Sequence, residues 1–367
     1  MQTKNITLLS GDGIGPEVSA EGEKLLKIIE KSFDYKFEII KKDFGGIAID
    51  KFGIPMPEDT LDICKKSDAV LLAAIGGPKW DNLPREKRPE SGLLGLRAGL
   101  QAFSNLRPVM VFDPLLDSST IKKDILSGTD LIVVRELTGG LYFGKPRGIE
   151  KRGNEKVGFN TMVYTESEIR RIAKVAFDIA KKRKKKVTSV DKANVLDVSQ
   201  LWRDVVTEVS KDYKDVILEH MLVDNCAMQL IKNPKQFDVI LTENMFGDIL
   251  SDEASMLTGS IGMLPSASIG DSSHPAIYEP VHGSAPDIAG KNLANPIAMF
   301  LSIALMFKYS FNDEKIYDVI LKSVKNVLEQ GYRTKDIYQT GAKQVGTKEM
   351  GEAICHFILG SVPANNL

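Results

Sequence analysis

The sequence predicts an α/β protein with a largely parallel sheet. Strand-like runs alternate with helical patterns almost from end to end, which is typical of strand-helix-strand units. The chain has 367 residues, 43% of them hydrophobic, so it can bury a substantial core in about two domains. The longest apolar stretch, residues 294–307, is shorter than the roughly 20 residues of a membrane span and predicts a buried core helix.

In the first part of the chain, runs rich in Ile, Leu and Val precede segments with apolar residues at helical spacing. The expected strands cover residues 5–10, 37–44 and 69–77, and the expected helices cover residues 16–32 and 57–67. The stretch SGDGIGP, residues 10–16, follows a strand and opens a helix. Its third glycine comes one residue too early for a dinucleotide fingerprint, and Pro16 takes that place. We therefore expect a tight turn with Pro16 near the first helical position.

The middle of the chain continues the alternation. The expected strands cover residues 131–136, 140–144, 186–192, 215–223 and 237–244, and the expected helices cover residues 199–213, 224–233 and 246–255. Another helix is expected to begin at a capping box formed by Thr165 and Glu168 and to end in the basic run 181–186. We interpret that run as solvated charge that complements the helix dipole, in preference to a binding patch.

The composition excludes several classes of partner. With 48 basic and 49 acidic residues, the chain has no basic surplus to attract nucleic acid or an anionic membrane. Three scattered cysteines, Cys64, Cys226 and Cys355, form no CxxC motif and predict a reduced, cytoplasmic location. The apolar run at the N-terminus is too short for a signal peptide.

Domain boundaries have to be placed at polar or glycine-rich turns, because no linker of low complexity interrupts the chain. The candidates are the region near Ala102 and the segment TGSIGMLPSASIG, residues 258–270. We expect one discontinuous domain built from residues 1–102 and 262–367, and a second built from residues 103–261.

Two aspartates, Asp248 and Asp252, lie four positions apart in TENMFGDILSDEAS, on one face of an expected helix. Their repulsion is relieved most simply by a hard divalent cation such as Mg²⁺ or Mn²⁺, whereas the alternative is a solvated acidic helix start. Asp224 and Lys192 also follow strands, at the edge where open α/β sheets bind ligands. The alternative for the acids is that each caps the helix behind it, which would explain neither Asp252 nor Lys192.

Three arginines, Arg97, Arg107 and Arg135, form a second set. Their planar guanidinium groups suit carboxylates, so together with a metal they indicate a substrate with two carboxylates. Singly, each could be a structural ion pair. The loop EPVHGSAPDIAG, residues 279–290, offers small residues and backbone N–H groups to a nucleotide, or is a structural loop.

The sequence as a whole resembles the metal-dependent β-decarboxylating dehydrogenases, the isocitrate/isopropylmalate dehydrogenase family. The matching motifs run through nearly the full length: GDGIGPEV, GGPKWD, LLGLR, NLRP, VRELTGGLYFG, DKANVL, VDNCAMQL, TENMFGDILSDEAS and HGSAPDIAGKNLANP. The resemblance implies an α/β, two-domain isopropylmalate dehydrogenase-like fold with a mixed sheet, not a true Rossmann fold. It also implies a nicotinamide cofactor in the cleft and a homodimer with shared active sites.

Residue roles follow from the resemblance by position. Arg97, Arg107 and Arg135 match the clamp on the substrate carboxylates, and Asp248 and Asp252 match metal ligands. Tyr142 matches the catalytic tyrosine, whereas Lys192 and Asp224 match residues that the partner subunit supplies, Lys192 as the base and Asp224 as a metal and substrate ligand. Residues that match cofactor-binding positions are Gly76, Gly77, Pro78, Glu279, His282, Gly283, Ser284, Ala285, Pro286, Asp287, Ile288 and Asn295.

Two groups of positions indicate the cofactor and substrate. Asp287 and Ile288 stand where NADP-dependent relatives carry a basic and an aromatic residue, so NAD is expected because a carboxylate repels a 2′-phosphate. An apolar wall for an isopropyl group is expected from Glu90, Leu93, Leu94 and the partner's Val195. These positions favour an NAD-dependent dehydrogenase whose substrate carries an isopropyl group. Two alternatives to that activity remain: a dehydrogenase for homoisocitrate, isocitrate or tartrate, and a metal- and nucleotide-binding module without redox activity.

Overall fold

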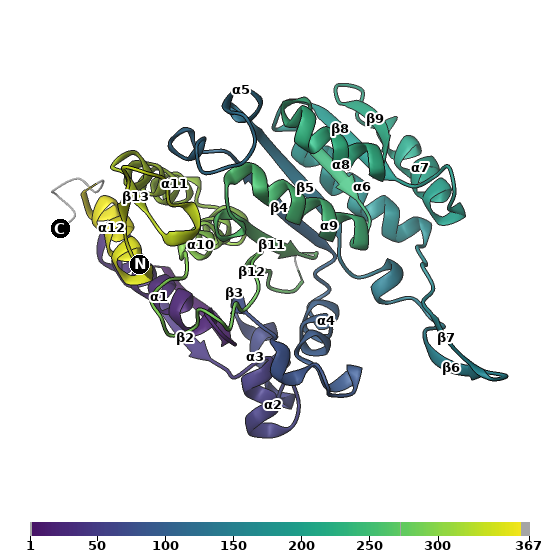
Figure 1. The fold of residues 1–367 in the computed structure, drawn as a ribbon, viewed down its shortest axis with the longest axis horizontal. Coiled ribbons are helices and arrows are strands. Elements are labelled where there is room, and N and C mark those ends of the chain that lie inside the picture. Colours follow the sequence, from purple (N-terminus) through teal and green to yellow (C-terminus); the bar gives the residue numbers. More distant parts are fainter. Residues whose placement is uncertain (1, 272, 361–367) are drawn as a thin grey trace.

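The computed structural model describes residues 2–271 and 273–360 and is built around one large mixed sheet (Figure 1). Ten strands lie in the order β2-β1-β3-β12-β11-β4-β5-β10-β8-β9. Within this described sheet, three antiparallel pairs, β12 with β11, β11 with β4 and β4 with β5, separate two parallel groups. The mixed α/β fold is confirmed. The alternation of strands and helices alone predicted only its parallel parts.

The strands of the large sheet are β1 (Gln2–Gly11), β2 (Tyr35–Lys41), β3 (Ala69–Ala74), β4 (Ser104–Met110), β5 (Asp130–Glu136), β8 (Lys186–Asp191), β9 (Ile217–Leu222), β10 (Val239–Thr242), β11 (Pro265–Ile269) and β12 (Ile277–Pro280). The helices are α1 (Gly15–Ser32), α2 (Gly46–Phe52), α3 (Glu58–Lys66), α4 (Pro89–Gly99), α5 (Lys123–Leu126), α6 (Glu166–Lys181), α7 (Asp197–Ser210), α8 (Val223–Lys232), α9 (Asn244–Ser255), α10 (Ile297–Tyr309), α11 (Glu314–Glu329) and α12 (Thr347–Gly360). Two short pairs complete the strands: β6 (Gly148–Arg152) with β7 (Glu155–Phe159), and β13 (Tyr332–Arg333) with β14 (Lys343–Gln344).

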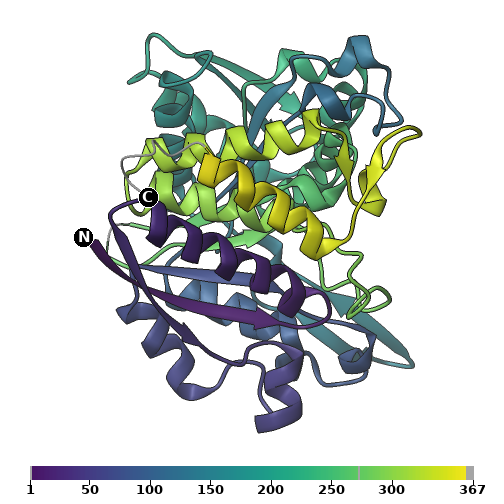
Figure 2. The same cartoon turned by 90° about the vertical axis from the view of Figure 1, so that its left-hand side faces the viewer.

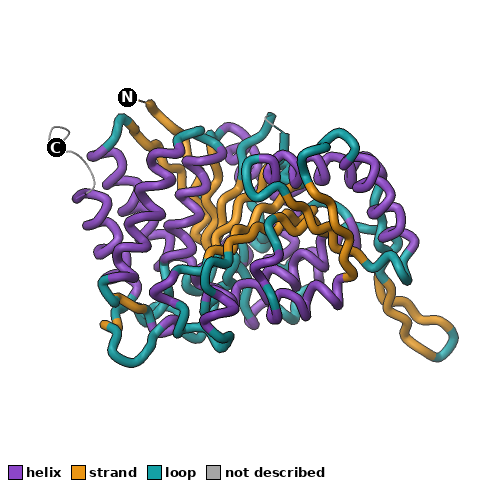
Figure 3. The backbone as a smooth tube through the Cα atoms, turned by 90° about the horizontal axis from the view of Figure 1, so that it is seen from above, coloured by secondary structure: helices purple, strands orange, loops and turns teal. Residues whose placement is uncertain are grey.

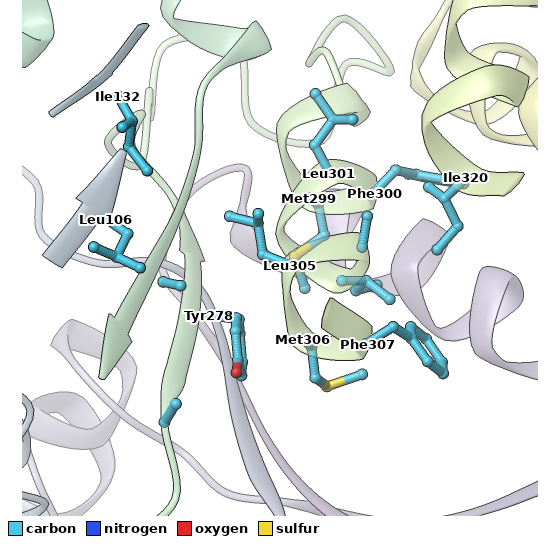
Figure 4. Close-up of a cluster of buried hydrophobic side chains, with 14 of the residues drawn as sticks. Leu106, Ile132, Tyr278, Met299, Phe300, Leu301, Leu305, Met306, Phe307 and Ile320 are labelled. Carbon is cyan, nitrogen blue, oxygen red and sulfur yellow. The ribbon is translucent and has the colours of Figure 1, made fainter. Parts of the chain in front are cut away.

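The two ends of the described chain meet in one layer. Helices α1, α11 and α12 lie side by side in front of the sheet (Figure 2). Behind them, α10 is buried from Ile297 to Phe307 and packs against β11 and β12, with Leu106 and Ile132 of the neighbouring strands facing the same cluster (Figure 4). A helix that is apolar all round belongs inside a protein, so the predicted core helix is confirmed. No helix within residues 2–271 and 273–360 is long and apolar enough to span a membrane.

The glycine-rich stretch at residues 10–16 forms the expected turn between β1 and α1, with Pro16 in the first helical turn. Gly11 and Gly13 have φ of +67° and +57°, the left-handed region that glycine adopts without a steric penalty. Between them, the Asp12 carboxylate accepts hydrogen bonds from the backbone N–H groups of Gly46, Ile47 and Gly76. The turn is therefore a structural anchor.

One predicted strand is wrong. Residues 140–144 form a 3₁₀ turn, η4 (Gly140–Tyr142), and not a strand. Gly140 has φ of +71° and lies against the Tyr164 hydroxyl, a close approach that no side chain at this position would allow. The apolar character of GLYFG therefore comes from packing in a turn.

Helix α6 begins as predicted: the Thr165 hydroxyl accepts from Glu168 N–H, and the Glu168 carboxylate accepts from Thr165 N–H. The basic run at its end is only partly solvated. Arg183 donates to the carboxylates of Asp130, on β5, and Asp238, directly before β10, so it also links the helix end to the sheet.

The hairpin of β6 and β7 extends away from the rest of the molecule (Figures 1 and 3). All five residues of β6 are exposed. The division of the chain into domains at residues 102/103 and 261/262 stays a prediction. Strands β4 and β11, which it assigns to different domains, pair directly with each other.

Candidate active site

A cleft of about 370 Å³ lies beside the carboxyl ends of β3 and β5. Eleven residues of the predicted site line it: Glu90, Leu93, Leu94, Arg97, Arg107, Arg135, Tyr142, Asp248, Glu279, His282 and Gly283. These residues come from segments more than 190 positions apart in the chain, and the fold brings them into one cavity. Such a cavity, with an apolar wall and several converging polar groups, has the composition of a small-molecule site.

Arg97, at the end of α4, is almost fully buried, and its guanidinium donates to the Glu279 carboxylate of β12 at 2.5 Å. Its Nε makes no hydrogen bond with the residues that the structure describes. A buried guanidinium with a free donor retains the capacity to bind a further acceptor.

Arg107, on β4, donates its shortest hydrogen bonds to neutral groups. Its Nε donates to Asn105 at 2.7 Å and its NH1 donates to Ser251 at 2.6 Å. Burial, reinforced by the nearby charge of Arg135, lowers the pKa of Arg107 to about 10, so the group is still cationic at neutral pH. The nearest carboxylate oxygens are Asp252 at 3.5 Å and Asp248 at 3.7 Å.

Asp248 links Arg135 to Tyr142. Its Oδ1 accepts from Arg135 NH1 at 2.5 Å, and its Oδ2 accepts from the Tyr142 hydroxyl at 2.9 Å. Burial opposes ionisation of Asp248, but the positive charges of Arg135 and Arg107 outweigh it and lower the pKa of this carboxyl. Burial, with the charge of Asp248, raises the pKa of Tyr142 to about 12. Tyr142 is therefore a protonated phenol at neutral pH.

The two aspartates of α9 differ in environment. Burial, together with the charge of Asp248, raises the pKa of Asp252, which is the more exposed of the two. Oxygen donors of this kind fit Mg²⁺ or Mn²⁺. Within residues 2–271 and 273–360 no three His, Cys, Asp or Glu side chains converge on one point.

Neither Asp224 nor Asp248 occupies the N-cap position of its helix. The N-cap of α9 is Glu243, whose carboxylate accepts from Met245 and Phe246 N–H, and the N-cap of α8 is Leu222. Asp248 lies inside α9, and Asp224 is the second residue of α8, where its carboxylate accepts from backbone N–H groups of the first turn.

The three residues predicted to come from the partner subunit, Lys192, Asp224 and Val195, lie outside the cleft. Lys192 and Asp224 form their own ion pair at 2.8 Å, and Val195 is 69% exposed. None of the three lines the cleft of its own chain. Asp252 is also absent from the cleft lining, one helical turn beyond Asp248.

The loop of residues 281–290 lies beside the glycine turn that follows β3. Ser284 Oγ donates to the Gly76 carbonyl at 2.8 Å, which joins the two segments. A side chain added at Gly283 would meet nothing within 4 Å, and the buried His282 leaves Nε2 without a partner among the described residues. Open space, exposed backbone and a free buried donor or acceptor fit a nucleotide.

The remaining positions of the cofactor prediction lie around this loop. Asp287 and Pro286 are exposed, whereas Ala285 and Ile288 are partly buried. Gly77 and Pro78 continue the turn after β3. The amide of the buried Asn295 accepts from Ile297 N–H at the start of α10 and donates to Asp336.

The sequence patterns did not indicate several residues that line the cleft or hold its arginines. Arg85 lines it, Asn105 and Ser251 orient Arg107, and Asn244 holds Arg135. Polar residues that act through a neighbour have no spacing signature, although Asn244 and Ser251 both lie within the motif that carries the two aspartates.

The chain is similar to known proteins along most of its length. The family model described as isocitrate/isopropylmalate dehydrogenase matches residues 5–354. A 3-isopropylmalate dehydrogenase of Aquifex aeolicus is 57% identical over 354 residues, which cover 96% of this chain and 97% of that one. One of Trichormus variabilis is 58% identical over 354 residues, covering 96% and 98%.

Solved structures share the fold. An isocitrate dehydrogenase from Methylococcus capsulatus superposes with a TM-score of 0.86 at 34% identity, covering 98% of this chain and 100% of that chain. A β-decarboxylating dehydrogenase from Thermococcus kodakarensis has a TM-score of 0.76 at 32% identity, covering 97% and 96%. The motifs, the fold and the sequence matches agree that this chain belongs to the isocitrate/isopropylmalate dehydrogenase family.

Proposed function

We propose that the protein catalyses the NAD-dependent oxidative decarboxylation of (2R,3S)-3-isopropylmalate to 4-methyl-2-oxopentanoate and CO₂, a step of leucine biosynthesis. The observation that carries the proposal is the convergence of Arg97, Arg107 and Arg135 on one cleft whose wall includes Leu93 and Leu94. Three guanidinium groups suit a diacid, and the leucines suit a branched apolar group. Relatives that are 57–58% identical bear the name of this activity.

The apolar wall separates this substrate from its tricarboxylic analogues. Isocitrate would place its third carboxylate against Leu93 and Leu94, where nothing offsets the cost of desolvating the charge. Glu90, on the same cleft, would repel it further. The site therefore favours a substituent without charge.

Asp248 and Asp252, with Asp224 of the partner subunit, would hold Mg²⁺ or Mn²⁺. When bound, the ion would act as a Lewis acid on the substrate hydroxyl and later on the ketone. Lys192 of the partner subunit would take the hydroxyl proton, and Tyr142, protonated at neutral pH, would supply a proton to the carbon that loses CO₂.

NAD is favoured over NADP by the cofactor loop. Asp287 is exposed on it, where a carboxylate accepts hydrogen bonds from ribose hydroxyls and repels a 2′-phosphate. The loop residues from His282 to Ile288, the turn at Gly76 to Pro78, Glu279 and Asn295 would surround the nucleotide.

A homodimer with shared sites is supported by the outer face of α8 and α9. Met228 and Ile231 on α8, Ile249 on α9 and Met256 directly after α9 are between 43% and 62% exposed. Exposed apolar side chains that gather on two adjacent helices are typical of a subunit interface. Asp224 lies on the same helix pair, which would bring it to the partner's cleft.

The direct test measures NADH formation with Mn²⁺ and, in parallel, 3-isopropylmalate, homoisocitrate, isocitrate and tartrate. We expect the highest kcat/KM with 3-isopropylmalate and NAD. A preference for isocitrate would refute the apolar-pocket argument, and a preference for NADP would refute the role of Asp287. Failure to oxidise any of the four acids would refute the enzyme proposal and favour a binding module.

A further inference from the structure

Asn244 is the polar residue that connects the arginine clamp to the tyrosine turn. It is the first residue of α9 and is 0% exposed. Its Oδ1 accepts from Arg135 Nε at 3.1 Å and from Arg135 NH2 at 2.8 Å. Its Nδ2 donates to the carbonyls of Leu137 and Gly139, each at 3.1 Å. Because a guanidinium only donates and a carbonyl only accepts, the amide fits in one orientation.

The bond to Arg135 sets which nitrogen faces the cleft. Asn244 occupies the edge formed by Nε and NH2, so NH1 is left toward the cleft, where it contacts Asp248. The amide oxygen is uncharged. It therefore satisfies the buried guanidinium without cancelling the charge that would attract a substrate carboxylate, as an acidic side chain would.

The bonds to Leu137 and Gly139 fix the backbone that leads into Tyr142. Two further contacts hold the same turn. The Glu136 carboxylate accepts from the N–H groups of Thr138 and Gly139, and the ring of Tyr164 leaves no room for a side chain at Gly139. The backbone N–H of Asn244 in turn donates to the Tyr164 hydroxyl at 3.0 Å.

We propose that Asn244 is a positioning residue that fixes the place of Arg135 relative to Tyr142. A diacid bound by Arg135 then presents its reacting carbon to Tyr142. This rests on the proposed function of Tyr142 and Arg135. One side chain has both roles. Its oxygen is a neutral acceptor for Arg135 on β5, and its nitrogen donates to two carbonyls of the segment that follows β5. No other standard side chain of this volume offers both, because aspartate lacks the donors and leucine lacks all of them.

The test is a double-mutant cycle between Asn244→Ala and Tyr142→Phe, measured as kcat and KM for 3-isopropylmalate. We expect Asn244→Ala to lower kcat/KM by about 10²-fold in the wild-type background, since misplacing a reacting group by about 1 Å costs that much. In the Tyr142→Phe background the same change should cost less than about 10-fold, because the group that it positions has gone. Equal losses in both backgrounds would overturn the proposal.

Two variants separate positioning from structural support. Asn244→Asp keeps the shape and the acceptor but faces two carbonyl oxygens without a donor, so it should fail to restore kcat and should raise KM. Restoration by aspartate would show that only volume matters. Ile240→Ala, in the apolar cluster under the same helix, should lower the melting temperature and leave KM unchanged.

A crystal structure of Asn244→Ala gives a result that does not depend on turnover. We expect Arg135 and the 137–140 backbone to move and the contact from Tyr142 to Asp248 to be lost, and unchanged positions would overturn the proposal. If the wild type prefers another of the four acids, the cycle is run with that acid. A wrong substrate assignment and a wrong positioning role therefore give different results.

Discussion

Individual buried polar residues carry most of the evidence for the site. Arg97, Arg107 and Arg135 are each buried, and each is held by a different kind of acceptor: a carboxylate, a neutral pair, and a carboxylate with an amide. A guanidinium removed from water needs such acceptors. The sequence indicated the need for partners, whereas the identity of the partners depended on contacts between distant segments.

We expect His282 to make the stability of the protein depend on pH. Burial lowers its pKa below the ordinary value of 6.5, so the folded protein holds the neutral ring. As the pH falls below 6.5, the unfolded chain takes up a proton that the folded protein does not. The free energy of unfolding should therefore fall, by about 1.4 kcal/mol per pH unit for this group, until the folded pKa is reached.

The check is urea unfolding of the wild type and His282→Gln between pH 5.5 and 7.5. The wild type should lose more stability than the variant as the pH falls. The pKa of His220 is also lowered by burial, and its contribution remains in both proteins. Parallel curves for the two proteins would contradict the assignment to His282.

At the level of elements, the close approach of α9 to β5 places Asp248 beside Arg135. Gly247 allows it. A Cβ at this position would lie 2.7 Å from Arg135 Cγ and 2.8 Å from Arg135 Cβ. The glycine in the middle of a helix costs up to about 1 kcal/mol relative to alanine, and the shorter distance between helix and strand offsets that cost.

Gly247→Ala should therefore lower both stability and activity. The added methyl meets atoms near the Arg135 backbone that cannot move away freely, so we expect a loss of about 1–3 kcal/mol in the free energy of unfolding. Displacement of Arg135 and Asp248 should raise KM for the diacid. Urea unfolding and steady-state kinetics measure the two effects.

Gly95→Ala, in α4, is the matched control. Its Cβ would meet only the end of Met56 at 3.4 Å, an ordinary contact. This substitution should be neutral or stabilising, by up to about 1 kcal/mol. A similar gain in stability for Gly247→Ala would show that the approach of α9 to β5 is not tight.

At the level of the whole molecule, Lys192 and Asp224 lie away from the cleft of their own chain. They pair with each other at 2.8 Å. If the sites are shared, each protomer gives Tyr142 to one site and Lys192 to the other.

Subunit mixing tests this arrangement. Tyr142→Phe and Lys192→Met should each be nearly inactive alone. After unfolding and refolding of an equal mixture, half of the dimers should be mixed, and each of these should have one intact site, giving about a quarter of the wild-type activity. The same mixture without refolding serves as the control. No gain in activity after refolding would contradict shared sites.

Local patterns predicted much of the fold. The runs at residues 186–192 and 237–244 were recognised as strands, the capping box at Thr165 began a helix, and residues 294–307 were recognised as core. The strand expected at residues 140–144 was wrong, because apolar composition does not distinguish a packed turn from a strand. The antiparallel pairing of β4 with β11 joins residues about 160 apart and has no local signal.

The sequence by itself determined the types of element, the chemical groups at the strand ends and, through the joint occurrence of its motifs, the family. Only the tertiary structure decided which of these groups face one cleft, that Asp248 accepts from both Arg135 and Tyr142, and that Asn244 holds Arg135. The physical reason is that propensity and periodicity act over a few residues, whereas a buried hydrogen bond depends on the distance between segments that meet only when the core packs.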